Sequence, residues 1–144
     1  MTNISLAQSY LLKAGKRLKI LAVLLDDQAY SDVIREAQEI VELSLKGRLR
    51  QVGIEPPKWH DVGGSLLEFR ERFPETIRPQ LERLASISSW LRKEREFSFY
   101  GDIDFIPTEE YSREDALRAI QDARFVVEMS SQLIPLPESK IPQQ

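Results

Sequence analysis

The chain has 144 residues, among them no cysteine and only one histidine, His60. The lack of cysteine excludes disulfides, thiol nucleophiles and cysteine-ligated metals. A single histidine is too little for an ordinary zinc site, although carboxylates stay open as ligands for Mg²⁺. The composition therefore leads us to expect no metal and no cofactor.

Long apolar runs and a strong charge of one sign are also missing. The longest purely apolar run, Ile20 to Leu25, is far shorter than the ~18 residues that span a bilayer. The first four residues lack the charged-then-apolar order of a secretory signal. We therefore expect a cytoplasmic protein.

The net charge of −3 provides no global basic field for nucleic acid. A nucleic-acid site would have to be a local patch, or one built by oligomerisation. The glycine pattern matches neither a P-loop nor a dinucleotide-binding turn, because Gly63-Gly64 alone is too weak a signal.

Apolar residues recur at steps of three and four, and this spacing predicts an all-α fold. We expect helices at about 5–26, 31–52, 60–72 and 77–98, a fifth that starts at Ser112, and no strand. The domain should cover 5–134 and be followed by a polar tail, 135–144. The predicted core consists of Leu11, Leu18, Leu21, Ile34, Val41, Leu45, Leu84, Leu91, Ala123 and Val127.

Several polar residues and glycines mark where helices begin and end. Ser31 and Asp61 are predicted N-caps, and Ser112 with Asp115 resembles a capping box. Gly101 should end the fourth helix, because glycine readily adopts the left-handed backbone found there. The loop 101–111 is long enough to be functional.

The most informative segment, 90–102, joins a charged helix end to an aromatic cluster and a glycine. Arg95 and Tyr100 are five residues apart, so near the helix end they point in neighbouring directions. Together they could hold a phosphate and a polar partner. The alternative is an ordinary helix end, whose cations complement the helix dipole while the aromatic rings pack into the core.

His60 also allows two interpretations. As a functional residue it would act as a general base or bind phosphate. As a structural residue it would orient the entry to the third helix beside Trp59, together with the capping Asp61. Its place after two prolines and before a cap favours the structural role.

The order of these segments resembles the HEPN domain, a small helical domain named for nucleotide binding in higher eukaryotes and prokaryotes. The similarity covers about residues 5 to 134, and the order and spacing of its motifs make it specific. Those motifs are Ala7 to Ala14, Ala37-x-x-Ile40-x-Glu42-x-x-Leu45-Lys46, Gly53-Ile54-x-Pro56-Pro57, Trp59-His60-Asp61-Val62, Arg95-Glu96-x-Ser98-x-Tyr100-Gly101-Asp102 and Ser112 to Ala116.

The resemblance implies an up-and-down four-helix bundle with an additional short helix, often as a homodimer. Many members of the family are metal-independent ribonucleases or toxins that use an Arg-x4-6-His motif. Others have a small nucleotidyltransferase as partner and antitoxin. Here Tyr100 stands where the catalytic histidine of Arg95-x4-His is expected. A phenol, with an ordinary pKa near ~10, is a poor base at neutral pH.

Three functions remain open. The first is a nucleotide- or RNA-binding protein that uses Arg92, Arg95 and Tyr100 and works with a nucleotidyltransferase. The second is a ribonuclease toxin, in which Arg92 or Arg95 stabilises the phosphorane and Tyr100 or His60 assists. The third is a helical scaffold without a ligand. We favour binding, because the chain lacks the base that the chemistry needs.

Overall fold

The structure is a computed structural model that describes residues 5–58 and 61–136, apart from the side chain of residue 96. The predicted role of His60, its neighbour Trp59 and the end of the predicted tail, 137–144, lie outside the described residues.

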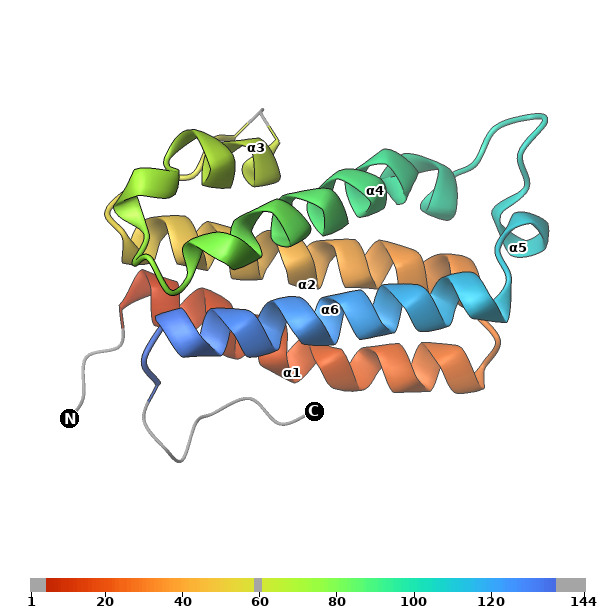
Figure 1. Ribbon diagram of the computed structural model, residues 1–144. Coiled ribbons are helices and arrows are strands. Elements are labelled where there is room, and N and C mark those ends of the chain that lie inside the picture. Colours follow the sequence, from red (N-terminus) through yellow and green to blue (C-terminus); the bar gives the residue numbers. More distant parts are fainter. Residues whose placement is uncertain (1–4, 59–60, 137–144) are drawn as a thin grey trace.

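Four long helices run side by side and form the bundle: α1 (Leu6–Asp26), α2 (Tyr30–Gln51), α4 (Leu81–Phe99) and α6 (Arg113–Leu133) (Figure 1). The short helix α3 (Val62–Glu68) packs on α4 at one end of the bundle. A second short helix, α5 (Pro107–Glu110), lies at the opposite end. The described residues contain no strand, so the all-α prediction is confirmed.

Two short 3-10 helices stand at the ends of two predicted α-helices. Arg70–Arg72 lies at the end of the predicted helix 60–72, and Arg78–Gln80 lies at the start of the predicted helix 77–98. The third predicted helix therefore ends at Glu68 as an α-helix, and the fourth begins at Leu81. Pro74 follows the first 3-10 helix and Pro79 lies within the second, and neither residue can donate the hydrogen bond of a regular helix interior. The predicted loop 101–111 also contains α5, which starts at Pro107.

Two of the three predicted caps are confirmed and one is wrong, and a further cap on α1 was not predicted. Ser5 and Gln8 form a capping box on α1, Ser112 and Asp115 form another on α6, and Asp61 caps α3. The predicted N-cap Ser31 is wrong, because α2 begins one residue earlier and Ser31 is buried inside its first turn. The N-cap of α2 is Ala29, without a side-chain hydrogen bond.

The helix α2 is the centre of the bundle, since it packs against α1, α4 and α6. All ten predicted core residues are buried, each at most 4% exposed. The spacing of the apolar residues therefore located the core correctly. Gly63 lets α3 approach α4, because a Cβ there would lie 3.0 Å from the backbone of Ala85.

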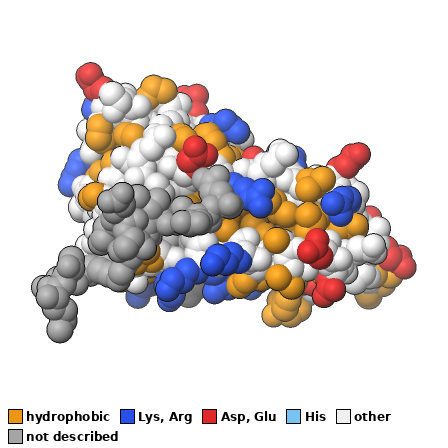
Figure 2. Space-filling view, turned by 90° about the horizontal axis from the view of Figure 1, so that it is seen from below, with side chains coloured by type: hydrophobic (Ala, Val, Ile, Leu, Met, Phe, Trp, Pro, Cys, Tyr) orange, Lys and Arg blue, Asp and Glu red, His pale blue; other side chains and the backbone are white. Residues whose placement is uncertain are grey.

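The outer surface carries both signs of charge. Seen from the side of α1 and α6, basic, acidic and hydrophobic side chains are interspersed (Figure 2). A functional surface of one sign must therefore be local. Among the described residues, no helix is long and apolar enough to cross a membrane.

Candidate functional site

The last turns of α4 bring Arg95 against α2. Its Nη2 atom lies 3.5 Å from Oε1 of Glu39, and Nε of Arg35 lies 3.6 Å from the same oxygen. Two guanidinium groups therefore share one carboxylate, and the three side chains carry a net charge of about +1 at neutral pH. All three are partly exposed, which leaves the cations accessible to an anion from solvent.

Two aromatic rings continue this surface at the end of α4. The guanidinium of Arg35 lies 5.1 Å from the centre of the Phe99 ring, a cation–π distance. Phe99 meets Tyr100 edge to face at 4.9 Å, and the two residues are 51% and 73% exposed. Phe99 and Tyr100 therefore do not pack into the core. We call Arg35, Glu39, Arg95, Phe99 and Tyr100 the arginine–aromatic surface.

A tight hairpin directly after Tyr100 fixes the end of this surface. Gly101 has a positive φ of 71°, and a Cβ there would lie 2.4 Å from the carbonyl oxygen of Phe105. The backbones of Asp102 and Phe105 exchange two hydrogen bonds, of 2.9 and 3.0 Å, across a two-residue turn. Ile103 at its tip is 93% exposed. Only glycine fits at 101, so the turn is specified by the sequence.

The other predicted site residues lie in different parts of the fold. Arg92 is partly buried and lies on α4 about one turn before Arg95. Asp61 lies at the start of α3, where its Oδ1 accepts a 3.0 Å hydrogen bond from the Gly63 amide. Its role there is local, because it satisfies a backbone donor at the start of α3.

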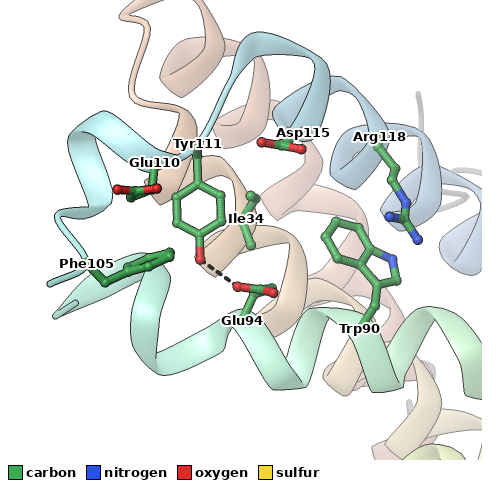
Figure 3. A pocket seen from close by; sticks show the side chains of 8 residues that line it. All are labelled: Ile34, Trp90, Glu94, Phe105, Glu110, Tyr111, Asp115 and Arg118. Carbon is green, nitrogen blue, oxygen red and sulfur yellow. Dashed lines mark hydrogen bonds between the residues drawn. The ribbon is translucent and has the colours of Figure 1, made fainter. Parts of the chain in front are cut away.

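A pocket of about 280 Å³ lies between α4, α6 and the segment that contains α5 (Figure 3). Tyr111 donates a 2.7 Å hydrogen bond to Glu94 across it. Burial, and then this bond and the charge of Glu94, raise the pKa of Tyr111 well above its ordinary value. The phenol is therefore a stable donor at neutral pH and not a base. This pocket is separate from the residues of the arginine–aromatic surface.

Arg48 is a buried cation that the sequence did not predict. It is 0% exposed, and burial lowers its pKa to about 10. Ser130 and Gln80 accept from it at 3.5 Å, at the limit of a hydrogen bond, and its Nε has no partner among the described residues. It cannot contact a ligand in solution, so it belongs to the structural core.

The sequence reasoning missed Arg35 and Glu39, which lie on a different helix from the informative segment. Their signal was the i, i+4 spacing of an arginine and a glutamate, which many exposed helices share. It also missed the pocket, whose lining comes from four separate stretches of the chain. The described residues contain no group of three or more acidic, histidine or cysteine side chains placed to hold a metal ion.

Comparison with known proteins agrees with this architecture. The family model of the HEPN domain matches residues 7–133. The Methanocaldococcus jannaschii protein named "Putative toxin MJ1304" is 26% identical over 134 residues, which cover 88% of this chain and 87% of that protein. The match with this relative therefore extends over most of the length of both chains. The chain belongs to the HEPN domain family.

Proposed function

We propose that the protein binds nucleotides or single-stranded RNA through the arginine–aromatic surface, extended by Arg92. The observation that carries the proposal is the pair of arginines, Arg35 and Arg95, that converge on one oxygen of Glu39 beside two exposed rings. This cationic and aromatic surface lies on a chain whose net charge is negative. It is the local patch that such a chain needs for a polyanion.

A phosphate can compete for these arginines on energetic grounds. Partly exposed ion pairs such as Arg95–Glu39 are worth about 0–1 kcal/mol. A hydrogen bond between a guanidinium and a phosphate is worth about 1.5–3 kcal/mol, and it is often bidentate. Loss of the contact to Glu39 therefore costs little, and a bidentate phosphate contact can replace it, while Glu39 holds both cations in place until the ligand arrives.

The rings add a second type of contact. Bases of single-stranded RNA stack on exposed aromatic side chains and on arginine planes. Phe99 and Tyr100 present two such rings next to Arg35. One phosphate on the arginines and one base on a ring would place a nucleotide along the end of α4.

Fluorescence anisotropy with labelled single-stranded RNA and a panel of nucleotides tests this proposal. Arg95→Ala should weaken binding by about 1–3 kcal/mol, as loss of a charge-assisted contact does. Glu39→Gln should strengthen it, because the amide removes the carboxylate that competes with phosphate. Tyr100→Phe should have a smaller effect than Arg95→Ala, because it keeps the ring and removes only the hydroxyl.

Arg124→Ala is the matched control, since Arg124 is an exposed arginine on α6. It changes the net charge as Arg95→Ala does, but on another helix. Equal affinities of the parent and Arg95→Ala, or an equal loss in Arg124→Ala, would place binding elsewhere.

We also propose a homodimer and a nucleotidyltransferase partner, both on the basis of the family resemblance. The end of α4 and the hairpin support an interface, because Phe97 and Ile103 expose apolar surface there that the proposed nucleotide site does not use. Multi-angle light scattering should give twice the chain mass, and Ile103→Glu should shift it toward the monomer. A monomer mass for the parent at micromolar concentration would contradict the dimer.

A ribonuclease toxin is the second candidate function, favoured by the name of the Methanocaldococcus jannaschii relative. In this case an arginine would stabilise the phosphorane, with Tyr100 in place of the family's histidine. Incubation of the protein with labelled RNA separates the two functions. Cleavage that Tyr100→Phe abolishes supports the ribonuclease, whereas binding without cleavage supports the first proposal.

A further inference from the structure

The pocket between α4 and α6 has a chemistry opposite to that of the arginine–aromatic surface. Three carboxylates line it, Glu94, Glu110 and Asp115, and Arg118 is the one basic residue among its lining side chains. The lining therefore carries about two negative charges at neutral pH. This negative charge would repel a phosphate, so any ligand of this pocket belongs to a different chemical class.

The walls between these carboxylates are aromatic. Phe105 and Tyr111 meet edge to face at 5.6 Å, and Trp90 lies on the side nearest α6 (Figure 3). The Trp90 ring is held in place because its Nε1 donates a 2.9 Å hydrogen bond to Asp122. Ile34 adds an apolar contact from α2. Aromatic faces bordered by carboxylates form an environment that favours organic cations.

One organic cation already occupies part of this wall. The guanidinium of Arg118 lies 4.1 Å from the centre of the Trp90 ring. Its ion pair with Asp122 is long, at 3.9 Å, and the Arg118 side chain is 64% exposed. The contact shows that the Trp90 face accepts a planar cation, while the long and exposed ion pair leaves Arg118 free to be displaced.

The carboxylates nearest to the aromatic walls keep acceptor capacity for a ligand. Glu94 accepts from Tyr111, and Asp115 accepts from the backbone amide of Ser112 at 2.9 Å. An ionised carboxylate can accept about four hydrogen bonds, so each has free lone pairs. Glu110 is exposed at the rim. These acceptors face a pocket with the volume of a small ligand site.

We propose that this pocket binds an organic cation with a guanidinium or primary ammonium group, held by Glu94 and the aromatic walls. The same group is found in small amines and on arginine or lysine side chains of another protein. The site is independent of the proposed nucleotide site, because it shares no residue with the arginine–aromatic surface.

Isothermal titration calorimetry with agmatine, spermidine and a short arginine-containing peptide tests the proposal. The uncharged analogue of the guanidinium, N-butylurea, is the ligand control. Glu94→Gln should weaken binding of the cations about tenfold, as loss of a charge-assisted hydrogen bond does. Arg118→Ala should strengthen it about threefold or more, because it frees the Trp90 face and removes a like charge.

Arg124→Ala is again the matched variant, since it removes the same charge from the same helix outside the pocket. Glu110→Gln, at an exposed position, should weaken binding without any risk to the fold. Tight binding of agmatine identifies a small amine as the ligand, and stronger binding of the peptide identifies a protein side chain. Either result supports the site.

Three results would overturn the proposal. The first is that none of the three cations binds saturably at millimolar concentration. The second is that N-butylurea binds as well as agmatine. The third is that Arg118→Ala and Arg124→Ala change the affinity equally, which would show a general effect of net charge.

Discussion

Replacement of Arg48 by methionine should stabilise the protein, although it removes a fully buried and well-packed side chain. The fall in pKa from the ordinary arginine value of about 12.5 to about 10 corresponds to about 3 kcal/mol of unfavourable free energy in the folded state. Among the described residues, its hydrogen-bond and cation–π partners are neutral: Ser130, Gln80 and the ring of Phe73 at 6.0 Å. Buried charges without an opposite charge are costly.

The gain is reduced by what the arginine contributes. Two hydrogen bonds of 3.5 Å are lost, and the hydroxyl of Ser130 loses a partner inside the core, which costs about 1 kcal/mol. Methionine fills a similar space with an unbranched apolar chain. We therefore expect Arg48→Met to raise the free energy of unfolding by about 1–2 kcal/mol.

Urea denaturation followed by circular dichroism measures this change, with Arg124→Met as the exposed control. Arg48 binds a proton less tightly in the folded protein than in the unfolded one. Its penalty is therefore complete below about pH 10 and falls as the pH rises above that value. The stabilisation by Arg48→Met should accordingly be constant between pH 6 and about pH 9. A loss of more than about 1 kcal/mol in the variant would refute this account of the buried cation.

Three further predictions concern the hairpin, the pocket and a helix cap. Gly101→Ala should destabilise the protein by about 1–3 kcal/mol in thermal unfolding because of its positive φ and lack of space, whereas Gly64→Ala should be neutral or stabilising. Tyr111 should ionise well above the ordinary pKa of a phenol in an ultraviolet titration, where Tyr111→Phe identifies its signal, and ionisation near the ordinary pKa would contradict the bond to Glu94. Ser112→Ala should cost about 1 kcal/mol in urea denaturation, through loss of the capping box on α6, and an unchanged midpoint would contradict that role.

The architecture was predictable because its signals are local. The steps of three and four placed Leu18 and Val41 in the core, and Ser112 with Asp115 marked the start of α6. The prediction failed at Ser31. Serine favours N-cap positions, but Ser31 lies inside α2, which begins at Tyr30 after the N-cap Ala29. Cap propensity is weaker than the packing of the whole helix, and here the packing decided.

The sites were harder to predict because they depend on contacts between helices. The ion pair between Arg95 and Glu39 joins α4 to α2, and no spacing along one helix reveals it. The exposure of Tyr100 likewise depends on how the helices pack. The pocket forms because a loop, which turns at Gly101, brings Tyr111 back to the same cavity that Trp90 lines. The sequence therefore indicated the segment of interest but not the carboxylates and cations that it meets.

The salt dependence of RNA binding tests the central claim most directly. For single-stranded RNA, each phosphate contact contributes about −0.7 to the slope of log affinity against log salt concentration. Because Arg35 and Arg95 together hold one phosphate, the double variant Arg35→Ala/Arg95→Ala should have a slope shallower by about 0.7 than that of the parent, whereas Arg124→Ala keeps the slope of the parent. A double variant that binds with the affinity and slope of the parent would contradict a nucleic-acid site on the arginine–aromatic surface.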